Sequence, residues 1–146
     1  MSGTLNLKII TPERIVFEAP VKQVTARAVD GELTVLPDHE PLVTALAIDV
    51  VEFKGEGSHD TAAVIGGVME VQRENDDSTS VTIVTNMAEL DIEIDEARAR
   101  QAKDRVEAEK TQKTDKLEVH MAEMALSKAM ARLKAVEMVK RRKGNR

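Results

Sequence analysis

Residues 79–99 read TSVTIVTNMAELDIEIDEARA, and the residue pattern of the chain changes within this stretch. From Thr79 to Thr85 apolar residues alternate with polar ones, which predicts a strand with one buried face. From Ile94 to Arg142, by contrast, Ala, Glu, Lys, Arg and Met dominate and β-branched residues are few, a composition that favours helix. The stretch therefore predicts a passage from a β half of the chain to a helical half.

The N-terminal half consists of short apolar runs that turn residues separate. All four Pro lie at or before residue 41, and the pair Gly66-Gly67 is interpreted as a turn or bulge. Strands are predicted at residues 5–10, 14–18, 21–29, 32–36, 47–53, 61–65, 68–72 and 80–85. Many short strands at this spacing predict a small sandwich or flattened barrel.

The C-terminal half predicts two helices that fold back on each other. Asp95 is an acceptable N-cap for the first helix, and the polar residues 111–115 form the turn before the second. Apolar residues recur three and four apart on both helices. They are Ala99, Ala102 and Val106 on the first helix and Val119, Ala122, Leu126, Ala129, Leu133 and Val136 on the second. Because many of these residues are small, the hairpin buries little apolar area and is expected to be marginally stable alone.

Charge divides the chain at the same place. Residues 1–88 carry 6 Lys and Arg against 14 Asp and Glu, whereas residues 89–146 carry 15 against 12. Such a change in net charge is typical of a boundary. We therefore expect an α+β fold, with an all-β sandwich in residues 1–88 followed by an antiparallel two-helix hairpin in residues 89–146.

Composition argues against several classes of function for this chain of 146 residues. A formal net charge of −5 and an aromatic content of 1% do not suit nucleic-acid binding, which needs a cationic surface and rings for base stacking. The chain has no Cys, and its three His do not have the spacing of a metal site. It has no glycine loop for phosphate and no nucleophile motif, so no catalytic residue is predicted. No apolar run approaches the roughly 20 residues of a membrane span, so any association with a membrane is expected through a partner.

Four cations border the apolar seam of the predicted hairpin. Arg98 and Arg105 belong to the first helix, and Lys128 and Arg132 are four residues apart on the second. If the helices are antiparallel, these side chains approach one another and repel unless an anion such as phosphate joins them. The other interpretation is salt bridging within each helix, for example between Asp95 and Arg98. Spacing alone leaves both interpretations open.

Three motifs resemble the epsilon subunits of bacterial-type rotary ATP synthases. They are GELTVLPDHEPLV at residues 31–43, GGVMEV at residues 66–71 and Thr11-Pro12 at the first turn. Their order, their spacing and the total length match the family, so the resemblance covers essentially the whole chain.

This resemblance implies a non-catalytic subunit of the central stalk of an F-type ATP synthase that moves protons or sodium ions. In that family the sandwich binds the gamma subunit and sits on the membrane rotor ring. Glu32 and the turn that bears His39 correspond to the part that faces the ring. The implied location is peripheral, on the cytoplasmic face of the bacterial plasma membrane.

Residues 94–99, IDEARA, are similar to the Ile/Leu-Asp-x-x-Arg-Ala motif of those epsilon subunits that bind ATP as a regulatory ligand. The motif implies an ATP site whose adenine end is formed by Glu89, Ile94, Asp95 and Ala99 and whose ribose and phosphate end is formed by Arg98, Arg105, Lys128 and Arg132. Lys128 stands where the family pattern has Arg, and Lys keeps the charge but loses the planar fork.

The same resemblance implies that the hairpin has two states. One is folded on the sandwich and is favoured by ATP, whereas the other extends along gamma toward the alpha/beta catalytic head and hinders ATP hydrolysis. Two other functions stay open. The chain could be a free-standing ATP-binding sensor or helical adaptor, or a small hydrolase that uses paired carboxylates. The hydrolase would need an apolar pocket that raises the pKa of one carboxyl group, and the sequence shows no such pocket.

Overall fold

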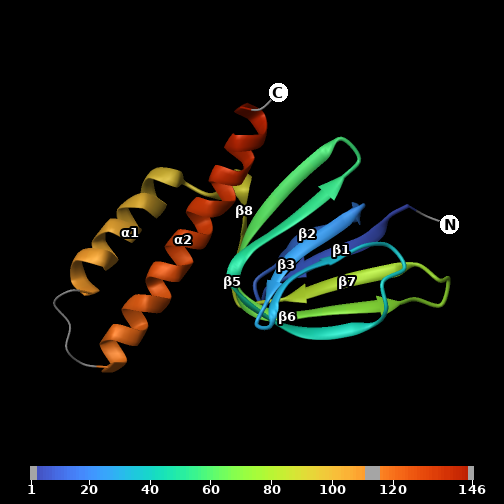
Figure 1. Cartoon of the computed structure of the whole chain (residues 1–146), viewed down its shortest axis with the longest axis horizontal. Coiled ribbons are helices and arrows are strands. Elements are labelled where there is room, and N and C mark those ends of the chain that lie inside the picture. The colour runs from blue at the N-terminus through green and yellow to red at the C-terminus, as the bar shows by residue number, and fades with distance from the viewer. Residues whose placement is uncertain (1–2, 111–115, 145–146) are drawn as a thin grey trace.

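The computed structural model describes residues 3–110 and 116–144, and these form a β-sandwich followed by two helices (Figure 1). The strands are β1 (Leu5–Ile10), β2 (Ile15–Val21), β3 (Gln23–Ala28), β4 (Gly31–Val35), β5 (Leu42–Gly55), β6 (Ser58–Arg73), β7 (Thr79–Val84) and β8 (Ala88–Leu90). The 3-10 helix η1 (Asp91–Glu93) leads to helices α1 (Glu96–Lys110) and α2 (Lys116–Gly144). The expected fold class is confirmed. The turn predicted at residues 111–115 lies outside the described residues.

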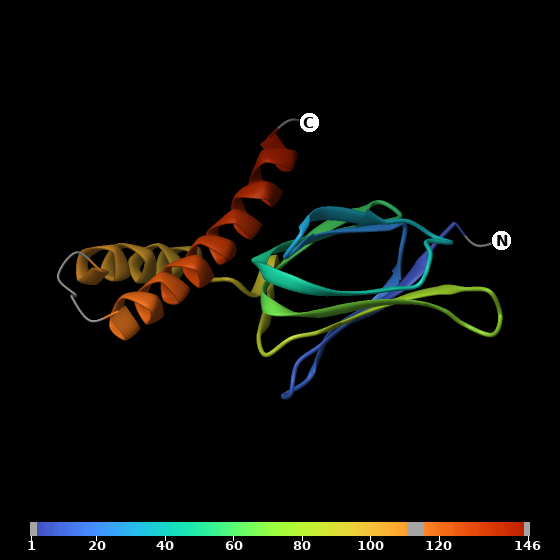
Figure 2. The same ribbon diagram turned by 60° about the horizontal axis from the view of Figure 1, so that its bottom comes forward.

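The two long strands β5 and β6 connect the layers of the sandwich (Figure 2). Hydrogen-bonded neighbours follow the order β2-β1-β7-β6-β5-β3-β4, and β8 pairs with β6 apart from this path. All pairs are antiparallel except β1 with β7. Apolar side chains from both layers fill the space between them. The largest that are less than 2% exposed include Leu5, Leu7, Ile9, Phe53, Met69 and Ile83.

The predicted strand at 21–29 is divided at Lys22. Its N–H donates to the carbonyl of Lys54 at 2.6 Å, and the segments on its two sides, β2 and β3, lie far apart in the strand order. The chain thus passes from one layer to the other at this residue. The single-strand prediction was wrong because periodicity within a strand does not show which neighbours the strand takes.

The strands predicted at 61–65 and 68–72 form one continuous strand, β6. Gly66 and Gly67 lie inside it with φ of 70° and 115°, at the point where β6 exchanges its neighbour β8 for β7. A Cβ on Gly67 would come within 2.3 Å of the carbonyl oxygen of Val84. The register with β5 continues across the pair, so the expected turn or bulge is a bend within a strand.

Helix α1 begins where the sequence predicts. The carboxylate of Asp95 accepts a hydrogen bond from the N–H of Arg98 at 3.1 Å, which confirms Asp95 as the N-cap. Ala99 and Val106 are buried, as are Ala122, Ala129 and Leu133 of α2. Helix α1 lies on the side of α2 that faces away from the sandwich (Figures 1 and 2). Neither helix has an apolar stretch long enough to cross a membrane in its described part.

Helix α2 packs on the sandwich through small residues. Ala131 and Ala135 are buried against Val50 of β5 and Ala63 of β6. The hydroxyl of Thr61, itself fully buried, donates to the carbonyl of Ala135 at 3.0 Å. We call this group of five residues the docking contact. The sequence stripe identified the face of α2 that meets α1 and missed this second face.

The predicted division between residues 1–88 and 89–146 falls within β8. This strand runs to Leu90 and pairs with β6, so backbone on both sides of the expected boundary belongs to the sheet. The division into two domains stays a prediction.

Candidate functional site

A cavity of about 340 Å³ lies where β8, η1 and the two helices meet. Its walls are formed by Glu89, Glu93, Ile94, Asp95, Arg98, Ala99, Ala102 and Arg132. Six of the eight residues predicted for an ATP site are among them. The remaining two, Arg105 and Lys128, do not line the cavity.

Each wall of the cavity comes from a different local structure. Strand β8 supplies Glu89, and the N-cap and first turn of α1 supply Asp95 and Arg98. Because the Asp95 carboxylate is hydrogen-bonded to the backbone at the helix start, its position is fixed. Ala99 and Ala102 have small side chains, which leaves room between the helices. The result is a hollow lined by both charged and apolar side chains beside a helix N-terminus.

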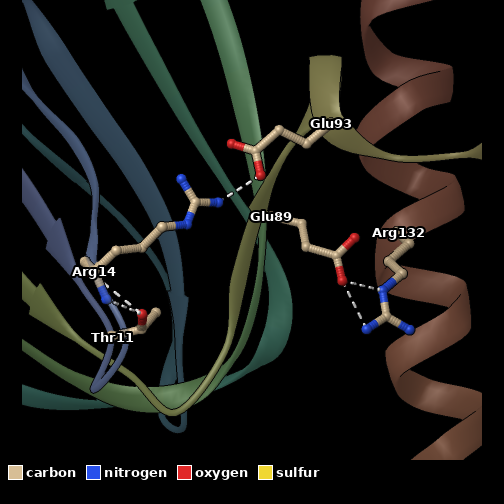
Figure 3. Close-up of polar contacts among 5 residues, drawn as sticks. All are labelled: Thr11, Arg14, Glu89, Glu93 and Arg132. Atoms are coloured by element: carbon tan, nitrogen blue, oxygen red, sulfur yellow. Dashed lines mark hydrogen bonds and ion pairs between the residues drawn. The ribbon is translucent and has the colours of Figure 1, made fainter.

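Glu89 and Arg132 form an ion pair across the cavity (Figure 3). Both Nε and Nη2 of Arg132 donate to Oε1 of Glu89 at 2.8 Å. The side chains are 30% and 24% exposed respectively, so this pair is better shielded from water than a surface pair. It joins the last strand of the sandwich to α2.

Glu93 forms a second ion pair, on the side of the linker that faces the sandwich (Figure 3). Its Oε2 lies 2.5 Å from Nη2 of Arg14, which follows β1. Sequence reasoning missed both residues. They are 79 positions apart, and neither belongs to a motif or an apolar stripe, so the sequence held no signal that would have paired them.

The guanidinium of Arg98 has no ion-pair partner among the residues that the structure describes. The salt bridge to Asp95 that was one alternative is absent, because that carboxylate binds the Arg98 N–H instead. Arg105 lies one turn beyond Ala102 on α1, and Lys128 one turn before Arg132 on α2. Neither has an ion-pair partner among the side chains that the structure describes. Three cations without an ion-pair partner among the described side chains, Arg98, Arg105 and Lys128, therefore lie along the hairpin.

A further ion pair joins α2 to the sandwich beside the docking contact. Lys134 Nζ lies 2.7 Å from Oδ1 of Asp49, and Arg27 Nε lies 3.1 Å from its Oδ2. Burial raises the pKa of Asp49, but the hydrogen bonds from Lys134 and the Val50 N–H and the two positive charges outweigh it and hold the pKa below 3.8. Ionised Asp49 thus favours the docked helix.

Glu32 and His39 lie on the sandwich and do not line the cavity. Glu32 is exposed on β4, opposite Arg27 of β3. His39 is half-buried in the turn after β4, where its N–H donates to the carbonyl of Leu36 at 3.1 Å. Their contact with a rotor ring stays a prediction.

Two family models together match nearly the whole chain. Residues 4–91 match the beta-sandwich domain of the ATP synthase delta/epsilon chain. Residues 93–137 match the long alpha-helix domain of the same chain. These limits agree with the sandwich and the helices of the structure.

Curated relatives carry the same description. The ATP synthase epsilon chain of Desulforamulus reducens is 40% identical over 137 residues, which cover 94% of this chain and 100% of the relative. The ATP synthase epsilon chain of Moorella thermoacetica is 42% identical over 134 residues, which cover 91% and 96%.

Solved structures show the same fold. A chain in the Euglena gracilis mitochondrial ATP synthase, determined as an OSCP/F1/c-ring structure, matches with a TM-score of 0.77 and 28% identity, covering 92% of this chain and 82% of that one. A chain in the central stalk and c-ring structure of the Tetrahymena thermophila mitochondrial ATP synthase matches with a TM-score of 0.56 and 15% identity, covering 90% and 96%, and supports the fold alone. By its family models and its relatives, the chain belongs to the ATP synthase delta/epsilon chain family.

Proposed function

We propose that the chain is a non-catalytic subunit of the central stalk of a bacterial rotary ATP synthase. Its membership of the family and its likeness to a chain from an F1/c-ring assembly support this role. The sandwich binds the gamma subunit and the rotor ring of a complex that moves protons or sodium ions. Glu32 and the turn of His39 face the ring. The subunit is held at the cytoplasmic face of the plasma membrane by these partners.

The cavity binds ATP as a regulatory ligand. The observation that carries this proposal is that six of the eight expected residues, separated by up to 43 positions in sequence, line one cavity. Adenine lies between Ile94 and Ala99, with Glu89 and Asp95 as acceptors for its amino group. The phosphates run past Arg98 and Arg132 toward the cations farther along the hairpin.

ATP acts on the position of the hairpin. The cavity has walls from β8, η1, α1 and α2, so a ligand in it contacts the sandwich edge and both helices at once. An extended hairpin would lose this shared site. ATP therefore shifts the population toward the folded state by the difference between its affinities for the two states. When ATP is scarce, the extended hairpin reaches the alpha/beta head and slows hydrolysis.

The test uses a double variant that carries both Asp95→Ala and Arg98→Ala. Its matched control is Arg100→Ala. Arg100 is on the same helix, pairs with Glu96 and does not line the cavity. ATP titration of the purified chain, with a fluorescence distance signal from the hairpin, is expected to show compaction in the wild type and the control. The double variant is expected to show none. An unchanged titration in the double variant would refute the assignment of the site.

Co-purification decides between a stalk subunit and a free-standing sensor. A tagged chain expressed in its native cell is expected to recover gamma and the membrane ATPase. Recovery of the chain without them, together with intact ATP binding, would favour the sensor. Turnover of ATP by the isolated chain would instead favour the carboxylate-based hydrolase.

A further inference from the structure

The linker η1 has no apolar anchor of its own. None of its three residues is buried, and the side chain of Ile92 is 82% exposed. Its contact with β6 is a long hydrogen bond, 3.4 Å from the N–H of Thr61 to Oδ1 of Asp91. Because so little apolar surface is buried, polar contacts set the position of this segment.

The ion pair between Arg14 and Glu93 is the short polar contact from η1 to the sandwich. At 2.5 Å it is a charge-assisted hydrogen bond, and the two side chains are 50% and 32% exposed. Arg14 itself belongs to a turn that hydrogen bonds to Thr11 hold in place. The Thr11 N–H and hydroxyl donate to the carbonyl of Arg14 at 2.9 and 3.1 Å, and the Arg14 N–H donates back to the Thr11 hydroxyl at 3.3 Å (Figure 3).

Glu93 connects this anchored turn to the cavity. It lines the cavity and directly precedes Ile94 and Asp95, which form the adenine end of the proposed site. Ile94 also packs beside the docking contact. A displacement of Glu93 therefore moves two ligand-contacting residues.

We propose that Arg14 and Glu93 are positioning residues of the nucleotide site, which hold η1 so that Ile94 and Asp95 face the ligand. This inference rests on the proposed ATP site. Arg14 also neutralises the Glu93 carboxylate, which points toward the sandwich and away from the pair of Glu89 with Arg132 (Figure 3).

The pair also connects the ligand to the sandwich. A ligand that fixes Ile94 and Asp95 keeps Glu93 near Arg14. By thermodynamic linkage, the intact ion pair raises the affinity for the ligand by the same factor by which the bound ligand raises the equilibrium constant for forming the pair. Occupancy of the cavity thereby stabilises the contact between η1 and the turn before β2.

A double-mutant cycle tests this inference in the full chain. Arg14→Ala and Glu93→Ala are each expected to weaken ATP binding about two- to fivefold, the range of a partly exposed ion pair. The double variant is expected to lose no more than the weaker-binding single variant, because the two residues act through one contact. Losses that multiply, or no loss in either single variant, would overturn the inference. Arg14→Lys is expected to recover part of the affinity.

The matched control is a variant that carries both Lys8→Ala and Glu18→Ala. This pair joins β1 and β2 at 3.5 Å and is remote from the cavity, so its loss is expected to leave ATP binding unchanged. Hydrogen exchange at residues 91–95 without nucleotide provides an independent signal, faster in Arg14→Ala than in the control. A wild type that binds no ATP would refute the proposed function, whereas exchange would still report whether the pair holds η1. Normal ATP binding with unchanged exchange in Arg14→Ala would refute the positioning role alone.

Discussion

Replacing Ala135 with Leu tests how α2 is held on the sandwich. The Ala135 side chain is fully buried and faces Val50 and Ala63, which are 7% and 2% exposed. Leu adds three carbon atoms to a side chain that is already fully buried. Overpacking of this kind costs about 1–3 kcal/mol, which shifts the docking equilibrium about 5- to 150-fold toward release. Leu favours helix nearly as much as Ala does, so α2 itself is expected to persist.

The assay uses one pair of fluorescent labels. The chain has no Cys, so cysteines introduced at the exposed positions Glu56 and Glu118 are labelled uniquely. Energy transfer between the sandwich and the distant end of α2 is expected to fall in Ala135→Leu. The matched control is Ala125→Leu, which makes the same change at an exposed position of α2. Unchanged energy transfer in Ala135→Leu would refute the view that small side chains are required for docking.

Three further variants test other contacts. Thr61→Val removes the buried hydroxyl that donates to Ala135 and is expected to weaken docking by about 0.5–1.5 kcal/mol in the same energy-transfer assay; full retention would show that this bond is dispensable. Although burial raises the pKa of Asp49, hydrogen bonds from Lys134 and the Val50 N–H and two nearby cations hold it below its usual value. The contribution of the Asp49–Lys134 pair to docking is therefore present at neutral pH and is lost as the pH falls through the lowered pKa. When energy transfer is followed during acid titration, Asp49→Asn is expected to lack the pH-dependent change that Asp49 contributes. An acid profile identical to that of the wild type would contradict this argument. Gly67→Ala places a Cβ 2.3 Å from the Val84 carbonyl at a φ of 115°, and urea unfolding is expected to show a loss of more than about 1 kcal/mol; wild-type stability would contradict the steric argument.

Local patterns predicted much of the fold. Alternation before Thr85 and helical composition after Ile94 located the passage from sheet to helices. The N-cap at Asp95 depends on residues three apart, so the sequence could show it. The exchange of layers at Lys22 and the continuous β6 depend on which strands are neighbours, and no local pattern carries that information.

The candidate site was predictable to the extent that a motif marks it. Residues 94–99 and their family resemblance identified the part of the cavity near the start of α1. The ion pair of Arg14 with Glu93 and the burial of Ala131 and Ala135 on β5 and β6 were missed. Ala131 and Ala135 lie outside the apolar stripe that recurs at three and four on α2, and a single charged pair between distant segments arises only when the fold brings them together.

The docking contact consists of three alanines, Val50 and the hydroxyl of Thr61, so it is weakly adhesive when it is open. Separation of α2 from the sandwich would expose Ala63, Val50, Thr61 and two alanines of the helix to water, together with parts of Ile48, Ile94 and Met138 that pack against them. A surface rich in alanine attracts unrelated proteins less than one made of large apolar side chains, since adhesion scales with the apolar area that is covered. Repeated release and docking of the hairpin would therefore carry a lower risk of aggregation than the exposure of a large apolar surface.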